Sequence, residues 1–194
     1  VPNLPILNEH ESVNTVGLLL VTGDRGLAGA FNSQIVRAGV RASTDDEGEG
    51  RSLAWYASGR RGVSSLQFRG KEVLGSYTGF TDRPAYGDAR DIASDLLTAY
   101  VDGKVEQVEI IYNHYISPLT QRVTRQTLLP LQHATILEGV DGEDEDGEEK
   151  DEAKRALVEY EPDPEDILQR LIPAYVEISI FRALLESTAS EHGA

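Results

Sequence analysis

The chain has 194 residues, with 33 acidic against 18 basic residues, a formal charge of −15, and neither cysteine nor methionine. The absence of cysteine excludes disulfides, thiol catalysis and cysteine-based zinc sites. The acidic balance argues against nucleic-acid binding and against electrostatic docking onto anionic lipid, because both need Lys and Arg facing phosphates. No apolar run reaches the length of a transmembrane helix, so we expect no direct membrane insertion.

The first half of the chain alternates between predicted strands and helices. VGLLLV at 16–21 is a continuous apolar run, typical of a strand buried on both faces of a parallel sheet. After a glycine-rich turn, residues 33–43 have helical apolar spacing, and TDDEGEG at 44–50 is expected to be a polar loop in which water screens Asp45 and Asp46. Further elements are predicted in this order: a strand at 52–58, a short helix or turn at 60–70, a brief strand within 71–79 and a helix at about 87–102.

The second half adds a hairpin and a long helix. QVEIIYNHYIS at 107–117 is predicted to be a long strand, and residues 120–131 its antiparallel partner at a sheet edge. The alternation of strands and helices indicates an α/β layered fold with a mostly parallel sheet. Residues 138–152, EGVDGEDEDGEEKDE, have no periodicity and are expected to be a solvated, mobile acidic loop. A calcium loop is disfavoured there, because Asp146 stands where the sharp turn needs glycine.

A helix is predicted from Pro164 to the last residue. Asp163 is a good N-cap, and Pro164 fits the first helical position because its missing N–H would have no partner there. A helix over 164–194 spans roughly 46 Å at about 1.5 Å per residue, with a bend expected near Pro173. Its apolar face is wide for a lone domain helix, so part of it should meet a further helix. The chain also starts without methionine, so we expect residues 1–194 to form one α/β domain of a longer protein.

The glycine-rich turn TGDRGLAGAFN allows two interpretations. Glycines between a strand and a helix could cradle a phosphate. The spacing fits neither dinucleotide nor P-loop motifs and no Lys is present, so a tight structural turn held by an ion pair or a cap is favoured. The four histidines share no ligand spacing, and no nucleophile motif occurs. We therefore expect no catalytic, metal-binding or cofactor-binding residues.

Three segments together resemble the gamma subunit family of F-type ATP synthase. GLLLVTGDRGLAGAFNSQIV is similar to the family's strand and (S/T)DRGLCG turn, and ISPLTQRVTRQTLLPL to its hairpin. The segment from YEPDP to ALLESTASEH resembles the approach to its long C-terminal helix. The residues that match the turn are Asp24, Arg25, Gly26, Leu27 and Gly29, and the resemblance favours a structural role for them.

The resemblance implies a fold and a function. The family has a Rossmann-like α/β domain inserted between two long terminal helices that form an antiparallel coiled coil, and residues 164–194 would begin the C-terminal one. Such a subunit is the central stalk of a rotary motor for ATP synthesis and hydrogen ion transport. It has no chemistry of its own and transmits torque between the membrane c-ring and the catalytic alpha/beta hexamer. The implied partners are the alpha, beta and epsilon subunits and the c-ring.

The resemblance also implies a location and an interface. The subunit would be a peripheral membrane protein on the cytoplasmic face of a bacterial plasma membrane. Tyr160, Glu161 and Asp163 would face the c-ring and epsilon at the foot of the stalk. Two alternatives stay open: a small nucleotide-binding α/β enzyme or switch that uses the glycine-rich turn, and an interaction domain regulated by its acidic loop.

Overall fold

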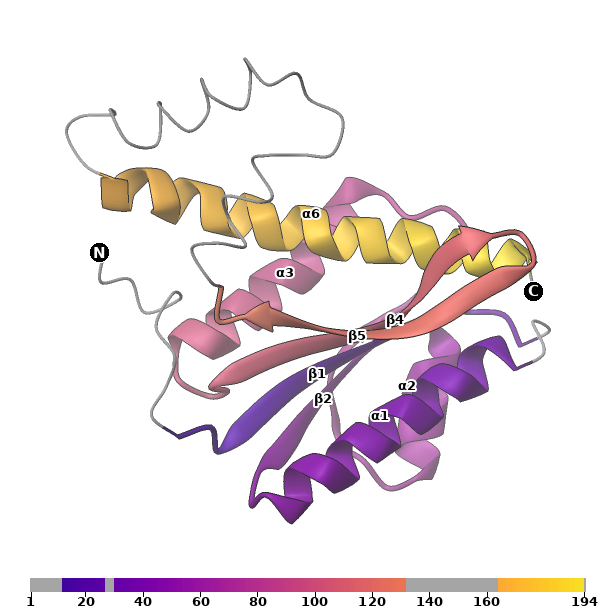
Figure 1. Cartoon of the computed structure of the whole chain (residues 1–194), viewed down its shortest axis with the longest axis horizontal. Coiled ribbons are helices and arrows are strands. Elements are labelled where there is room, and N and C mark those ends of the chain that lie inside the picture. Colours follow the sequence, from indigo (N-terminus) through magenta and orange to yellow (C-terminus); the bar gives the residue numbers. More distant parts are fainter. Residues whose placement is uncertain (1–11, 27–29, 132–163, 194) are drawn as a thin grey trace.

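The computed structural model describes residues 12–26, 30–131 and 164–193 (Figure 1). Five strands and four helices occur in these ranges. The strands are β1 (Thr15–Val21), β2 (Ser52–Ser58), β3 (Val73–Tyr77), β4 (Gln107–Ser117) and β5 (Thr120–Leu129). The helices are α1 (Phe31–Gly48), α2 (Arg60–Phe68), α3 (Tyr86–Val101) and α6 (Pro164–Gly193).

The strands form one mixed sheet in the order β3-β2-β1-β4-β5. β1 pairs in parallel with both β2 and β4, and β2 pairs in parallel with β3. β5 lies at the edge and runs antiparallel to β4. The predicted α/β class, the mostly parallel sheet and the antiparallel edge hairpin are therefore confirmed.

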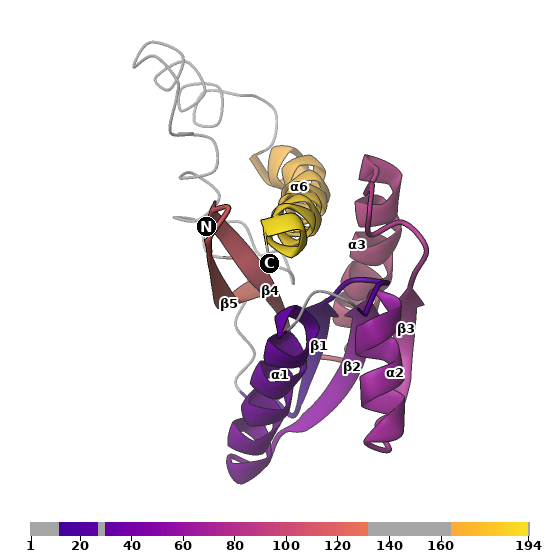
Figure 2. The same cartoon turned by 90° about the vertical axis from the view of Figure 1, so that its right-hand side faces the viewer.

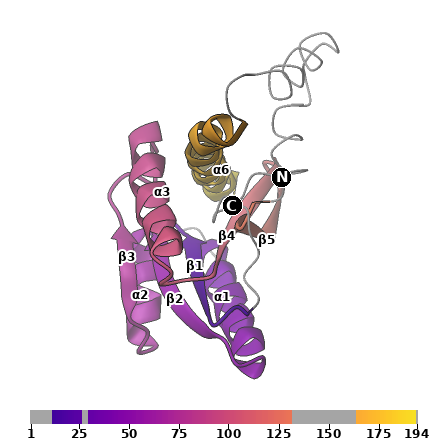
Figure 3. The ribbon, with the colours of Figure 1, turned by 90° about the vertical axis from the view of Figure 1, so that its left-hand side faces the viewer.

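Helices cover both faces of the sheet, as Figures 2 and 3 show from opposite sides. Alternate residues of the buried strands point to opposite faces. Leu18 and Leu20 of β1 pack with residues of α1 and α2, whereas Leu19 and Val21 pack with residues of α3 and α6. This division explains why the β1 sequence is a continuous apolar run, because neither face of β1 is left to solvent.

Helix α6 belongs to the core of the domain. Ile172, Val176, Ile180 and Leu184 recur at helical spacing and are at most 2% exposed. They join the cluster formed by α3, β1, β4 and β5. The helix continues through Pro173. No helix in the described ranges is both long and apolar enough to cross a membrane.

One predicted boundary is wrong. Residues 44–48 are the last turns of α1, not a loop, and the helix ends at Gly48. Asp45 is exposed, as expected, but Asp46 is only 3% exposed. The sequence suggests a loop because acidic residues and glycines crowd these positions. In the structure Arg51, just after the helix, and Arg125, on β5, both pair with Asp46, as described below. The acidic segment at 138–152 lies outside the described residues.

Candidate functional site

The glycine-rich turn leaves β1 at the carboxyl end of the parallel strands. The Thr22 backbone N–H and its hydroxyl both donate to the Ser58 carbonyl at 2.8 Å, and the hydroxyl accepts from Gly62 N–H at 2.9 Å. Gly59 has φ +95°, and a Cβ there would lie 2.3 Å from the Thr22 carbonyl oxygen. Only glycine allows this close approach, which joins the turn to the end of β2 and the start of α2.

Asp24 is the hub of the turn. One carboxylate oxygen accepts from Arg60 N–H at 2.9 Å, and the other accepts from Gly79 N–H at 3.0 Å and Thr81 N–H at 3.3 Å. The Asp24 backbone N–H donates to the Thr81 hydroxyl at 2.9 Å. Arg60 is the first residue of α2, so Asp24 satisfies a free N–H at the start of a helix that is distant in sequence. One side chain thus ties β1, α2 and the connection between β3 and α3 together.

The environment of Asp24 keeps its carboxylate ionised. Burial raises the pKa of Asp24. The hydrogen bonds from Arg60, Thr81 and Gly79 together lower the pKa by more than burial raises it, so the net pKa is below the ordinary value of 3.8. The negative charge also lies at the N-terminus of α2, where the helix dipole favours it.

The structure describes two of the other residues of the predicted turn, Arg25 and Gly26. Arg25 forms an exposed ion pair with Asp82 at 2.8 Å. Gly26 lies so close to the Arg61 guanidinium that an added Cβ would come within 2.3 Å of it. Leu27 and Gly29 lie outside the described residues, as do the predicted interface residues Tyr160, Glu161 and Asp163.

Asn32 braces the same turn, and sequence reasoning missed it. Its side-chain oxygen accepts from Gly23 N–H at 2.9 Å, and its amide donates to the Arg25 carbonyl at 3.0 Å. The available signal was an asparagine in the first turn of a helix directly after a glycine-rich loop, where short amide side chains commonly bond to nearby backbone groups.

The C-terminal end of α6 packs over this turn. The Thr188 hydroxyl donates to the Thr81 carbonyl at 2.7 Å, and the Ser190 hydroxyl donates to the Asn113 carbonyl of β4 at 3.3 Å. The Glu191 carboxylate lies so close to Gly23 that a Cβ on this glycine would be 2.7 Å from it. Burial, and then the negative charge of Asp82, raise the pKa of Glu191. In doubly wound sheets the crevice between β1 and β4 is where ligands bind, and here α6 places a carboxylate beside it.

The histidines form no metal-binding group in the described part of the chain. The His114 Nδ1 on β4 contacts the Glu186 carboxylate of α6 at 2.7 Å, which is a second polar link between the hairpin and this helix. Among the described residues, no three or more His, Asp or Glu side chains are arranged to hold a metal ion.

Helix α6 also has an apolar outer side. Leu171, Ile178 and Leu185 recur every seven residues, with Ala174 between the first two. Ile178 is 48% and Leu185 45% exposed, and Leu171 and Ala174 are half-buried. We call these four residues the outer stripe of α6. Apolar residues that repeat every seven positions are part of the heptad pattern through which one helix packs along another.

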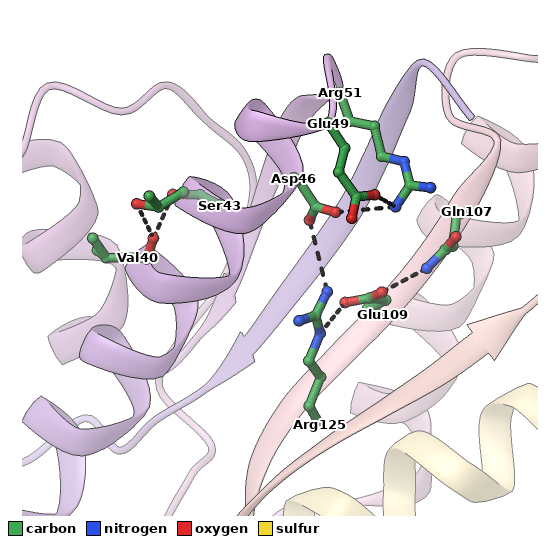
Figure 4. Close-up of polar contacts among 9 residues, drawn as sticks. Val40, Ser43, Asp46, Glu49, Arg51, Gln107, Glu109 and Arg125 are labelled. Carbon is green, nitrogen blue, oxygen red and sulfur yellow. Dashed lines mark hydrogen bonds and ion pairs between the residues drawn. The ribbon is translucent and has the colours of Figure 1, made fainter. Parts of the chain in front are cut away.

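A partly buried ionic network on the side of the sheet that α1 covers was not predicted (Figure 4): the Asp46 and Glu109 carboxylates are buried, whereas Arg125 and Glu49 are exposed. The Arg125 Nε of β5 donates to Glu109 of β4 at 2.6 Å, and its Nη2 lies 3.7 Å from Asp46 Oδ2. Arg51 lies 3.4 Å from Asp46 Oδ1 and 3.1 Å from Glu49. Hydrogen bonding to Glu109 raises the pKa of Arg125 despite partial burial. The network fixes the C-terminus of α1 to β4 and β5.

Known proteins match the chain over nearly its whole length. The family described as ATP synthase matches residues 2–194. The ATP synthase gamma chain of Streptomyces coelicolor is 40% identical, over 98% of this chain and 61% of that protein. That of Rubrobacter xylanophilus is 38% identical, over the same shares of the two chains. This chain thus spans about three fifths of the length of the curated relatives that it matches.

Solved structures agree on the fold. The central stalk and c-ring structure of the Tetrahymena thermophila mitochondrial ATP synthase contains a chain with a TM-score of 0.67 and 24% identity, covering 95% of this chain and 74% of that one. A chain of the Euglena gracilis mitochondrial ATP synthase rotor has a TM-score of 0.63 and 17% identity, covering 93% and 64%. The family match over residues 2–194 and the named relatives confirm the resemblance seen in the sequence, and the chain belongs to the family of ATP synthase gamma chains.

Proposed function

We propose that the chain is the globular part of the central stalk of an F-type ATP synthase, where it transmits torque and performs no bond chemistry. The observation that carries this proposal is the double use of α6. Its inner side, at Ile172, Val176 and Ile180, is part of the domain core, whereas its outer stripe is half-buried to exposed and has heptad spacing. A helix that is core on one side and coiled-coil-like on the other connects the domain firmly to a rod.

The contacts of α6 suit a mechanical link. The Tyr86 hydroxyl of α3 donates to Glu177 at 2.8 Å, and its ring packs edge-to-face on Phe181 with 5.5 Å between the centroids. At its far end, Thr188 and Ser190 bond to the β3–α3 connection and to β4. A close-packed helix with polar links at its middle and at its C-terminal end transmits displacement to the sheet instead of absorbing it.

The partners of the whole protein follow from this function. The alpha and beta subunits would surround the coiled coil, and the c-ring and epsilon subunit would contact the foot. We propose Tyr160, Glu161 and Asp163 as part of that foot, and Asp24, Arg25, Gly26, Leu27 and Gly29 as a structural turn. The complex would be associated with the cytoplasmic face of a bacterial plasma membrane, in line with the bacterial relatives.

A nucleotide-binding function has less support. Phosphate at the glycine-rich turn would meet the Glu191 carboxylate beside Gly23, and the amide at the start of α2 already donates to Asp24. A partly buried carboxylate next to the turn repels the anion that such a site would need to attract.

The outer stripe provides the test. In the full-length chain, assembled with its partner subunits in sealed vesicles, Ile178→Asn with Leu185→Asn should reduce proton-driven ATP synthesis at least tenfold. Each change places a polar amide in a helix–helix contact, at about 1–3 kcal/mol per unsatisfied group. Val101→Asn, at a 63% exposed position on α3, is the matched control and should leave synthesis unchanged.

The two variants separate a rod contact from a general loss of stability. Circular dichroism of the double variant should match that of the parent chain, since both side chains are nearly half exposed in the domain. Unchanged ATP synthesis in the double variant, with the complex intact, would contradict the proposal.

A further inference from the structure

Helix α2 has a charge distribution unlike the rest of the chain. From Ser52 to Lys71 there is no Asp or Glu but four basic residues, in a protein of formal charge −15. Two of them, Arg60 and Arg61, occupy the first two positions of α2, where the helix dipole disfavours positive charge. The Asp24 carboxylate at this helix end offsets part of that cost, but no acidic residue on the helix itself does, so the arginine charges are not neutralised within α2.

The exposed side of α2 forms one continuous row. Arg61, Ser64 and Phe68 are spaced i, i+3 and i+7 and are all exposed, with Arg60 and Arg69 flanking them. The arginines Arg60, Arg61 and Arg69 form no ion pair with any carboxylate of the described residues. The nearest carboxylate to the start of the helix, Asp24, already accepts three backbone N–H groups.

Phe68 makes this row unusual. It is 93% exposed, the highest value among the large apolar side chains of the described residues. A shallow depression beside it is lined by Ser64, Ser65, Phe68 and Arg69. An exposed aromatic ring between arginines, next to a hollow with hydroxyl groups, has the composition of a protein interface, where aromatic residues and Arg are enriched.

We propose that the outer row of α2 docks an acidic segment of a partner subunit, which takes Phe68 into an apolar recess and pairs its carboxylates with Arg61 and Arg69. The charge complementarity is local. At physiological ionic strength the potential decays over about 8 Å, so a short acidic segment senses mainly the arginines. A membrane or a nucleic acid is an extended polyanion that would also meet the acidic remainder of the surface, so both are disfavoured.

The inference rests on the proposed function, because it needs the assembled complex, and the test uses that complex. In the purified ATP synthase with the full-length chain, Phe68 is replaced by p-benzoyl-phenylalanine, and the photo-adduct is mapped by mass spectrometry. The expected adduct lies in an acidic segment of another subunit. Val101→p-benzoyl-phenylalanine, also exposed but on α3, is the control and should not label that segment.

Charge variants complete the experiment. Arg61→Gln with Arg69→Gln should lower the adduct yield about tenfold, since both charge contacts with the acidic segment are lost. Arg61→Lys with Arg69→Lys keeps both charges and should retain most of the yield.

Two failures are distinguishable. An intact complex overturns the inference if Phe68 labels lipid, this chain or a non-acidic segment, labels nothing beyond the control, or gives a yield independent of the charge variants. A full-length chain that never enters the complex overturns the proposed function itself.

Discussion

The C-terminus of α1 and the N-terminus of α2 each carry charged side chains that interact unfavourably with the helix dipole, negative at α1 and positive at α2. The last turns of α1 hold Asp45, Asp46 and Glu47, and the first turn of α2 holds Arg60 and Arg61. In each case the charge is the one that the helix dipole disfavours. The two helices are neighbours on one face of the sheet (Figure 1), but they differ in whether these charges have ion-pair partners within the chain.

At α1 an acidic side chain is paired with arginines of the same chain. Asp46 is buried between Arg51 and Arg125, and Arg125 also neutralises Glu109. At α2 the arginines are exposed and have no carboxylate partner among the described residues, although the Arg61 guanidinium lies against Gly26. The Asp24 carboxylate satisfies backbone N–H groups instead. A charge that the helix dipole disfavours is thus paired within the fold at α1, whereas at α2 it has no carboxylate partner among the described residues and is free to meet the partner that we propose.

The largest effect is expected from removing the α1 network. Arg125→Met keeps much of the side-chain volume but leaves the Glu109 carboxylate buried without its counter-charge and leaves Asp46 with Arg51 alone. We expect a loss of about 3 kcal/mol in the free energy of unfolding, measured by urea denaturation. Arg122→Met, on the same strand and also exposed but without an ion pair among the described residues, is the matched control and should change stability by less than about 0.5 kcal/mol. Equal effects of the two changes would show that the network does not stabilise α1.

A smaller effect is expected at the cap of α2. Asp24→Asn replaces one acceptor oxygen by a donor that faces backbone N–H groups, so we expect a loss of about 1–2 kcal/mol. Because the pKa of Asp24 is lowered in the folded chain, its ionised form stabilises the fold above the unfolded pKa of about 3.8. That contribution is lost as the pH falls through the folded pKa.

The pH dependence gives this prediction its own check. The difference in unfolding free energy between the parent chain and the Asn variant should be constant near neutral pH and shrink below about pH 4. Asp82→Asn, which removes an exposed partner of Arg25, is the control and should show little difference at any pH. A difference that does not vary with pH would mean that the carboxylate charge has no part in the cap.

The sequence predicted the strands better than the polar contacts. β2 and β4 have the predicted bounds, 52–58 and 107–117, because apolar runs flanked by glycine and polar residues are local signals. The end of α1 was misplaced because only part of what holds it is local: Arg51 follows the helix closely, but Arg125 lies on a strand far along the chain. A pattern of acidic residues and glycine cannot reveal that a distant arginine neutralises one of them.

The candidate site shows the same limit. The turn at Asp24, Arg25 and Gly26 was singled out from its motif, and a cap or an ion pair was among the predicted ways of holding it. The sequence could not show that the Asp24 carboxylate bonds to the start of α2 and to Gly79, because the helix that follows the turn in the sequence is α1. Tertiary packing brings these amides together, and no spacing in the sequence records it.

The smallest change in the free energy of unfolding, and the only predicted increase, is expected at the N-terminus of α2, where the arginines have no ion pair among the described residues. Arg61→Gln removes a positive charge from the helix N-terminus and breaks no ion pair of the described residues. The free energy of unfolding should therefore rise slightly, by about 0.3–1 kcal/mol at low salt, and the gain should fade as salt screens the dipole. Thermal unfolding at two ionic strengths measures both. A destabilised variant would mean that Arg61 makes a stabilising contact within the chain. Helix α2 would then resemble α1, where the unfavourable charge is paired inside the fold and not by a partner.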